Sequence, residues 1–443
     1  MLELPWLALV VVGSIVALLF SVRFIGTIKR TVQDRNVIGI YLATLGLGTA
    51  YGMAISVIAV FLKDRGYSET DIGSLAAWFA AGIMGTALAS GALVGRFGAK
   101  RVLVAALLTY ATTVTLFPLA PSYGAIAALR VVDGAASVLV WVASETILVA
   151  RARRDIKAFV TSIYGMSIAV GYGIGSGSAF LAAKLLPNER VFLVAGAISV
   201  VTGLFVLLRL EHNAEAHRAD ADAAAGADAG SGTDAGVAPG EKTPLGTLIN
   251  RIKTSCFATF AYGYFQSSVV LFLPLFMKDE KGIPEAQTRL ITFFFAAGML
   301  LAINLAGRVG DRHGHLLVMR LLAMVGLTMI AAFVWINGFS GMAIAVFVAG
   351  ATLASISPLS LALQGLVTRE YHRATGVYNA FYAAGMVLGP PISSQIFRTQ
   401  GGGPMLYHLA ALWVAFVIFA QVYRRDDPAA SRNGLPASLP AAD

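Results

Sequence analysis

The sequence predicts an all-α membrane protein built from two pseudosymmetric six-helix halves, with one extra N-terminal spanning helix before the first half. Composition supports the membrane class, because hydrophobic residues make up 57% of the 443 residues and charged residues only 13%. Mean hydropathy is +0.74, well above that of soluble domains. A glycine-rich loop that carries arginine occurs twice between long apolar runs, which predicts an internal duplication.

The predicted spans are apolar runs of about twenty residues, the length that a helix needs to cross a bilayer. Seven precede the middle of the chain: 5–22, 37–62, 72–95, 102–120, 123–150, 158–183 and 191–208. Six follow it: 254–277, 290–307, 316–337, 341–367, 374–397 and 404–423.

These spans divide the chain into five segments. We expect an extra transmembrane helix with a cytoplasmic link at 1–36, an N-terminal six-helix bundle at 37–210 and a C-terminal six-helix bundle at 250–424. The segment 211–249 is rich in Ala, Gly and Asp without apolar periodicity, and this composition predicts a disordered cytoplasmic linker. The same composition predicts a disordered cytoplasmic tail at 425–443.

Basic residues predict how the chain lies in the membrane. Lys and Arg gather in alternate loops, and the positive-inside rule makes that side cytoplasmic. The first span lacks a basic n-region and a cleavage site, so we expect an uncleaved helix with its N-terminus in the periplasm. The net charge of +9 therefore reflects topology in a multi-pass protein of the inner membrane, and not nucleic-acid binding.

The repeated loop is the clearest motif. It reads GALVGRFGAKR from Gly91 and AGRVGDRHGHL from Ala306. Gly98 and Gly314 are separated by the same interval as Gly134 and Gly350, which places the two halves in register.

These loops resemble the major facilitator superfamily over nearly all of 37–423. The family pattern is Gly-x-x-x-Asp-Arg-x-Gly-Arg-Arg. The first copy matches at Gly91, Arg96, Gly98, Lys100 and Arg101, with Gly95 at the acidic position. The second copy matches at Gly307, Asp311, Arg312 and Gly314, with His315 at a basic position. The resemblance implies gating loops in a monomeric secondary transporter that works by alternating access.

Further motifs extend the resemblance. Arg130, Asp133 and Gly134 are similar to the Arg-x-x-Gln-Gly signature of proton-coupled members, with Asp in place of Gln, and Trp141, Val142 and Glu145 resemble the Trp-Val-x-x-Glu of some bacterial permeases. The predicted span 158–183 carries part of the drug-exporter signature, and the predicted span 374–397 is a closer match. The glycines and proline concerned are Gly171, Gly173, Gly175 and Gly177, then Gly385, Gly389 and Pro390. We expect them to serve as packing or hinge positions at the pseudosymmetric interface.

Ionisable residues inside a spanning helix are costly, so Arg130, Asp133 and Glu145 are the candidate proton-coupling residues. Together with Ser137 and Trp141 they fall on one helical face, which we expect to line a central water-filled cavity. Arg130 and Asp133 are spaced to pair across one turn. That pair either exchanges partners during transport, which would release Arg130 to an anionic substrate, or fixes the helix statically.

Glu145 has no charged neighbour on its own face before Arg151, so we expect it to carry the proton. In an alternative interpretation, Glu145 reaches Arg96 or Arg101 and replaces the acid that is missing at Gly95.

Aromatic and amide side chains on the predicted cavity helices form the candidate site for an amphipathic substrate, although each one is also explained by helix packing. They are Tyr41, Tyr51, Tyr164, Tyr262, Tyr264, Gln266, Asn304, Asn379 and Tyr382.

No catalytic, metal-binding or nucleotide-binding motif occurs, so we expect no enzyme activity, no metal and no cofactor. Our leading hypothesis is proton-coupled export of a small molecule. Proton-coupled uptake of a metabolite or siderophore is the alternative within transport, and a non-transporting assembly factor or sensor is the alternative outside it.

Overall fold

The computed structural model describes residues 34–67, 69–182, 186–211, 243–288 and 291–428. The predicted extra helix at 5–22, most of the predicted linker and most of the predicted tail lie outside these residues. The described part of the chain is helical and contains no strand.

The first half consists of α2 (Arg35–Asp64), α3 (Glu69–Phe97), α4 (Ala99–Leu116), α5 (Tyr123–Arg151), α6 (Lys157–Ala182) and α7 (Asn188–Arg209). The second half begins with short α9 (Leu245–Arg251), followed by α10 (Lys253–Asp279) and short α11 (Glu285–Thr288). It continues with α12 (Ile291–His313), α13 (His315–Phe333), α14 (Phe339–Val367), α15 (Tyr371–Gln400), α16 (Gly402–Val422) and the short turn η3 (Arg424–Asp426).

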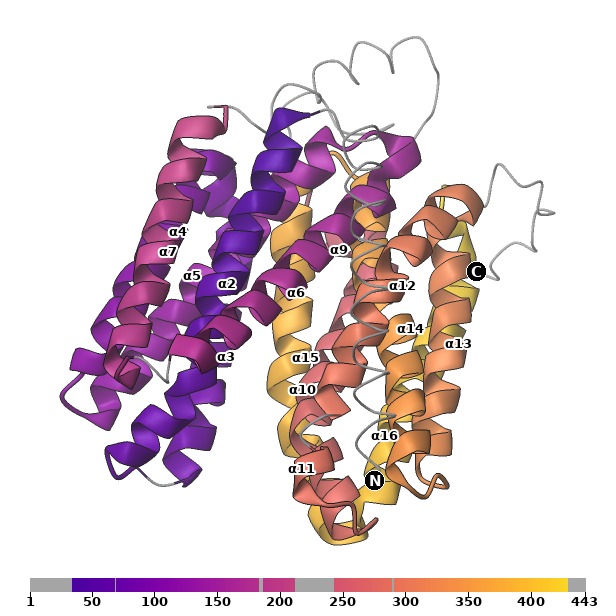
Figure 1. The fold of residues 1–443 in the computed structure, drawn as a ribbon. Helices are drawn as coiled ribbons and strands as arrows, with labels where there is room; N and C mark the ends of the chain where they lie inside the picture. Colours follow the sequence, from indigo (N-terminus) through magenta and orange to yellow (C-terminus); the bar gives the residue numbers. More distant parts are fainter. Residues whose placement is uncertain (1–33, 68, 183–185, 212–242, 289–290, 429–443) are drawn as a thin grey trace.

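Each half packs around its own apolar core, and the two halves stand side by side (Figure 1). Helix pairs repeat between the halves, because α2 packs on α6 as α10 packs on α15, and α3 packs on α5 as α12 packs on α14. Large aromatic side chains fill both cores, for example Phe61 and Phe192 in the first and Trp413 and Phe416 in the second. The predicted pair of pseudosymmetric bundles is therefore confirmed.

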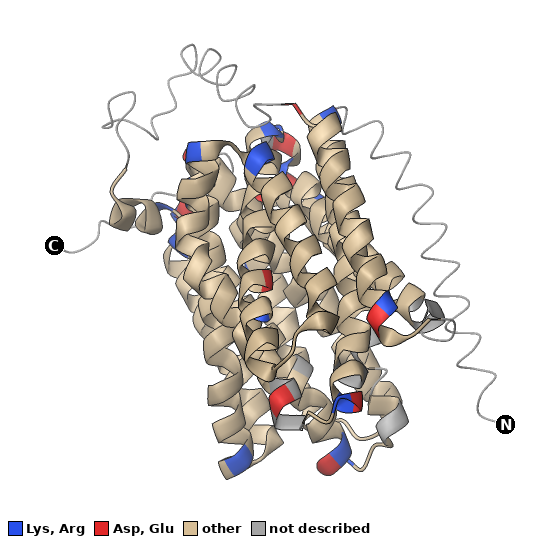
Figure 2. Cartoon of the chain, turned by 90° about the vertical axis from the view of Figure 1, so that its left-hand side faces the viewer, with Lys and Arg blue, Asp and Glu red and all other residues tan. Residues whose placement is uncertain are grey.

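The described helices are those of a multi-pass membrane protein. Ten of them are long and apolar enough to span a bilayer, and α10 makes an eleventh if its two parts, bent by 42°, form one span. Charged residues gather mainly at the two ends of the bundle (Figure 2). The predicted total of twelve spans and one extra N-terminal span stays a prediction, because α15 is not among the helices that are long and apolar enough by this measure.

We call the end of the bundle where α7 finishes and α9 starts the linker end. There, α3 passes into α4 at Gly98 and α12 passes into α13 at Gly314. Both glycines have positive φ, 83° and 103°, a backbone region that other residues rarely adopt. The two copies of the repeated loop thus make the same turn, which explains the glycine at each position.

The predicted packing glycines bring helices together within each half. A Cβ at Gly171 would clash with the Leu45 carbonyl of α2, and a Cβ at Gly385 would clash with the Phe260 carbonyl of α10. Gly175 and Gly389 make similar approaches, to α2 and α10, whereas Gly173 faces open space. We expected these glycines at the interface between the halves, but they tighten the pairs α2–α6 and α10–α15. The helix α15 runs through Pro390 and Pro391.

Candidate transport site between the halves

A buried carboxyl group on α5 meets an amide on α15. The Nδ2 atom of Asn379 donates a hydrogen bond of 2.7 Å to Oε2 of Glu145 and a second, of 3.0 Å, to the carbonyl oxygen of Thr375. Both side chains are buried, with 7% of Glu145 and 3% of Asn379 exposed. Because α5 belongs to the first half and α15 to the second, this hydrogen bond joins the halves in the interior of the bundle.

Tyrosines surround the Glu145 carboxyl group. Tyr164 of α6 and Tyr378 of α15 are buried and lie within electrostatic reach of Glu145. The hydroxyl of Tyr378 donates to the Ser357 carbonyl at 3.1 Å. The hydroxyl of Tyr164 has no hydrogen-bond partner among the described residues. Among the described residues, Glu145 forms no ion pair with Arg96 or Arg101. The alternative interpretation, in which Glu145 replaces the acid missing at Gly95, is therefore not observed.

An aromatic group lies one turn of α5 farther from the linker end. Trp141 meets Tyr382 of α15 edge to face, with ring centroids 6.1 Å apart, and Tyr382 stacks on Tyr262 of α10 at 6.3 Å. The Tyr382 hydroxyl donates to Oε1 of Gln266 at 2.8 Å. Gly263 permits this packing, because a Cβ there would clash with the Tyr382 carbonyl. These contacts place Tyr262 and Gln266 of α10 against Tyr382 of α15, which in turn packs on Trp141 of α5.

The Arg130–Asp133 ion pair forms as predicted, across one turn of α5, and both side chains are buried. The Arg130 guanidinium also lies over the ring of Phe79, with Cζ 4.5 Å from its centroid. Arg130 Nε and Asp133 Oδ1 have no hydrogen-bond partner among the described residues. Ser137 lies one turn farther along α5 and is also buried.

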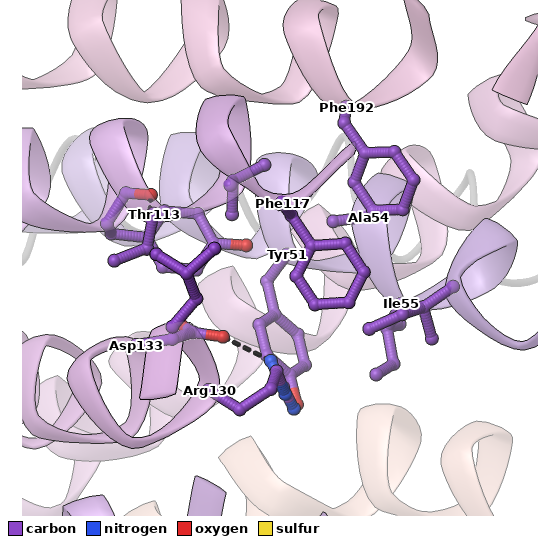
Figure 3. Close-up of a pocket in the computed structure, with 12 residues that line it drawn as sticks. Tyr51, Ala54, Ile55, Thr113, Phe117, Arg130, Asp133 and Phe192 are labelled. Carbon is purple, nitrogen blue, oxygen red and sulfur yellow. Dashed lines mark hydrogen bonds and ion pairs between the residues drawn. The ribbon is translucent and has the colours of Figure 1, made fainter. Parts of the chain in front are cut away.

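The cavity beside this pair lies inside the first half. Tyr51 and Ile55 of α2, Thr113 of α4 and Phe192 of α7 line it together with Arg130 (Figure 3). Its volume of about 20 Å³ is enough for one water molecule. The predicted polar stripe therefore does not line one central cavity. Helices of the first half cover α5 at Arg130, whereas α15 covers it at Glu145.

At the linker end, α12 closes on the start of α6. The carboxylate of Asp311 accepts hydrogen bonds from the backbone N–H groups of Ala158 (2.8 Å) and Phe159 (2.9 Å). These groups belong to the first turn of α6, where backbone N–H groups have no acceptor within the helix and the helix dipole favours a negative charge. Nearby, Ser162 donates to Oδ1 of Asn304 at 2.8 Å. The second copy of the loop motif thus uses its acidic residue to hold the two halves together.

The first copy closes on α15 without an acidic residue. Gly91 lies against the His372 carbonyl, 2.5 Å from where its Cβ would be, as Gly307 lies against the Ala158 carbonyl in the other copy. The His372 ring lies 2.6 Å from the place that a Cβ of Gly95 would take. The two closures are therefore equivalent in backbone position but different in chemistry, since an imidazole occupies the space next to Gly95.

A family model described as Major Facilitator Superfamily matches residues 40–252 and 255–441, which is most of the chain. The chain belongs to the major facilitator superfamily. Its members are secondary transporters and not enzymes, and two halves of the chain match the model, as the internal duplication predicted.

Solved structures of this superfamily share the fold at low sequence identity. A human organic anion transporter, MFSD10 (TETRAN), has a TM-score of 0.70 and 15% identity, covering 87% of this chain and 99% of its own. A variant of the E. coli fucose:proton symporter FucP has a TM-score of 0.67 and 13% identity, covering 86% and 98%. FucP in the outward conformation has a TM-score of 0.64 and 14% identity, with the same coverage. A search of curated proteins gave no match.

Several candidate residues in this superfamily member serve packing within one half. Tyr41 donates to the Val160 carbonyl at 3.0 Å, and Tyr264 is hydrogen-bonded to Nε2 of His408 at 2.7 Å. Lys100 donates to the Leu210 carbonyl at 2.6 Å, which fixes the start of α4 to the end of α7. The Nε2 atom of His315, which follows the turn at Gly314, lies 3.3 Å from Oδ1 of Asp311, which precedes it. Arg312 is exposed at the linker end.

Lys157 is an interhalf residue that sequence reasoning missed. Its side chain is 2% exposed, and Nζ donates to the carbonyl oxygens of Val149 (2.7 Å) and Gly365 (3.0 Å), one in each half. Next to it, the hydroxyl of Thr161 donates to the Pro358 carbonyl at 2.9 Å. In the sequence, Lys157 is one of several basic residues in a short loop, and nothing in that pattern distinguishes it from residues that only set topology.

Proposed function

We propose that this protein exports a small amphipathic or anionic molecule across the inner membrane in exchange for protons, as a monomer, by alternating access of its two halves. The observation that carries the proposal is the hydrogen bond from Asn379 to Glu145. A buried carboxyl group that bridges the moving halves links its own protonation to the conformation of the protein.

Protonation changes the strength of this bridge. A hydrogen bond to an ionised carboxylate is roughly twice as strong as one to a neutral acceptor. Ionised Glu145 therefore holds α15 against α5, and protonated Glu145 loosens that contact and favours opening at the linker end. Loss of the proton after opening restores the stronger acceptor and favours closure.

The end of the bundle that is closed supports export as the direction of transport. The interhalf contacts described above, including those of Asp311 and of Glu145, all lie on the linker-end side of the bundle. Basic loops favour a cytoplasmic position for that end. A proton that reaches Glu145 from the periplasm would then open the protein towards the cytoplasm, where the proton leaves and the substrate enters. This order of events is that of an antiporter.

The aromatic group beside Glu145 supports an amphipathic substrate. Trp141, Tyr262 and Tyr382 offer flat apolar faces, and the Gln266 amide offers a polar group next to them. Such a combination suits a compound with an apolar body and a polar or charged end. MFSD10 is described as an organic anion transporter, so organic anions belong in the panel of compounds to be tested.

The test uses purified protein in liposomes that contain a pH-sensitive dye, with a panel of amphipathic compounds and organic anions. We expect substrate-dependent proton movement in the wild type and its loss in Glu145→Gln, which keeps an acceptor for Asn379 but cannot release a proton. Glu189→Gln removes an exposed carboxyl group of the same half and serves as the control. Proton movement retained in Glu145→Gln would contradict the assignment of Glu145 as the proton carrier. If no compound of the panel caused proton movement in the wild type, a non-transporting role would be favoured.

A further inference from the structure

Two arginines lie within electrostatic reach of each other at the linker end of the α13–α16 pair. Arg320 is in the second turn of α13, Arg424 follows α16, and the charge of Arg424 acts on the Arg320 guanidinium. Arg320 Nε is buried and has no hydrogen-bond partner among the described residues. A partly buried guanidinium group beside a second positive charge is stabilised by a negative group nearby.

The carboxylates of the neighbouring segment are already engaged. Asp426 forms an ion pair with Lys253 of α10, with Nζ and Oδ2 3.4 Å apart. Asp427 is within electrostatic reach of Arg320, but its Oδ2 atom accepts the backbone N–H of Leu316 at 2.8 Å and so caps the start of α13. The charges of Asp427 and Arg424 both act on Arg320, so the two guanidinium groups outnumber the one carboxylate within reach of Arg320.

The surface next to these arginines is apolar and faces outward. The helix α13 lies at the outer edge of the second half and packs on α16 (Figure 1). Large apolar side chains follow one exposed face of each helix at spacings of three or four residues, which marks the lipid-facing side. They are Leu317, Leu321, Met324 and Val325 on α13, and Val414, Ile418 and Val422 on α16.

We infer that Arg320 and Arg424 bind the phosphate of an anionic phospholipid in the leaflet at the linker end. Its acyl chains lie along the exposed apolar faces of α13 and α16. Guanidinium groups bind phosphate oxygens through charge-assisted hydrogen bonds, and Arg320, which lies one turn after Leu317 and directly before Leu321, presents its charge at the depth of a headgroup. Both the excess charge and the apolar faces fit this ligand, whereas free phosphate would use the charge alone.

The experiment measures binding of dioleoylphosphatidylglycerol to the full-length protein in detergent, by native mass spectrometry and by the shift in unfolding temperature. Dioleoylphosphatidylcholine and inorganic phosphate are measured in parallel. We expect phosphatidylglycerol to bind and stabilise more than either of them. Each basic residue near an anionic surface contributes about 1 kcal/mol, so Arg320→Gln or Arg424→Gln should each weaken phosphatidylglycerol binding about fivefold.

Arg153→Gln is the matched control, because Arg153 is an exposed arginine at the same end of the bundle that already pairs with Asp155. This variant should bind phosphatidylglycerol as the wild type does. Arg424 follows the last helix, so its variant tests the site even if Arg320→Gln fails to fold. Unchanged phosphatidylglycerol binding in Arg424→Gln would overturn the assignment. Equal stabilisation by inorganic phosphate would also overturn it, in favour of a soluble anion.

Discussion

Glu145 on α5 accepts a 2.7 Å hydrogen bond from Asn379 on α15, although 234 residues separate them in the chain. The bond links the two halves at a buried position next to tyrosines. Any motion that separates α5 from α15 must break it. The closed arrangement at the linker end should therefore depend on this pair.

Asn379→Leu removes the donor and leaves the Glu145 carboxyl group buried without it. We expect the closed arrangement to lose about 1–3 kcal/mol, which shifts the equilibrium towards opening at the linker end by a factor of roughly 5 to 150. Spin labels at Arg153 and His313, on a Cys256→Ala background, report the distance between the halves, and that distance should increase. Thr399→Val, which changes an exposed residue of the same helix, should leave the distance unchanged.

The sequence was sufficient to predict both members of this pair as candidates, but not their contact. Apolar periodicity, the repeated loop and the cost of a buried charge indicated two bundles and singled out Glu145. Its partner depends on how α5 and α15 are rotated about their axes, which packing decides. For the same reason, the stripe from Arg130 to Glu145 was expected to face one cavity, whereas neighbouring helices divide it between the first half and the interface.

Gly91 should be sensitive to any side chain. A Cβ there would lie 2.5 Å from the His372 backbone carbonyl, and backbone cannot move aside as a flexible side chain can. We expect Gly91→Val to prevent closure of α3 on α15, with at least a tenfold loss of transport but normal membrane abundance.

Gly85→Ala is the control on the same helix, because a Cβ at Gly85 meets no atom within 4 Å. This change should leave transport intact, and the higher helix propensity of alanine should stabilise the protein by up to about 1 kcal/mol. Equal transport in the two variants would contradict a close approach of α3 and α15 during the cycle.

The Arg130–Asp133 pair should behave as a unit. Removing one partner leaves a buried charge uncompensated, so Arg130→Met or Asp133→Leu alone should cost about 3–5 kcal/mol and lower the yield of folded protein. The double variant should recover most of that stability. Unfolding in detergent measures the stability of the single and double variants, and a liposome assay measures their transport. We expect the double variant to fold without transporting, whereas normal transport in it would assign the pair a purely structural role.

The difference between the two loop copies predicts a gain of stability. Asp311 caps the first turn of α6, whereas Gly95, at the same position of the first copy, faces the His372 ring. Gly95→Asp alone should clash with that ring. Combined with His372→Ala, the new carboxylate should reach the first turn of α15 and stabilise the closed arrangement by about 1 kcal/mol. Transport should then slow several-fold, and a double variant that transports as fast as the wild type would contradict equivalence of the two closures.

Glu370 gives the linker end a defined acid dependence. It lies between α14 and α15, where its carboxylate accepts the backbone N–H of Thr243 at 3.2 Å and pairs with Arg373. Partial burial acts to raise the pKa of Glu370, but the hydrogen bonds from Thr243 and Arg373 and the Arg373 charge outweigh it, so the pKa lies below its usual value. Arg373 also donates to the Thr243 carbonyl at 2.8 Å, so the pair holds the chain where it enters the second half.

A carboxyl group whose pKa is lower in the folded than in the unfolded protein stabilises the fold only when ionised. The contribution of Glu370 should be complete above the unfolded value of about 4.3 and should disappear as the pH falls through the lower, folded value. Glu370→Gln should therefore lower the unfolding temperature at pH 7, with a cost of about 1 kcal/mol or less for a partly exposed pair. At pH 3 the difference from the wild type should shrink. A difference that grew on acidification would contradict the ionised pair, because it would require Glu370 to stabilise the fold in its protonated form.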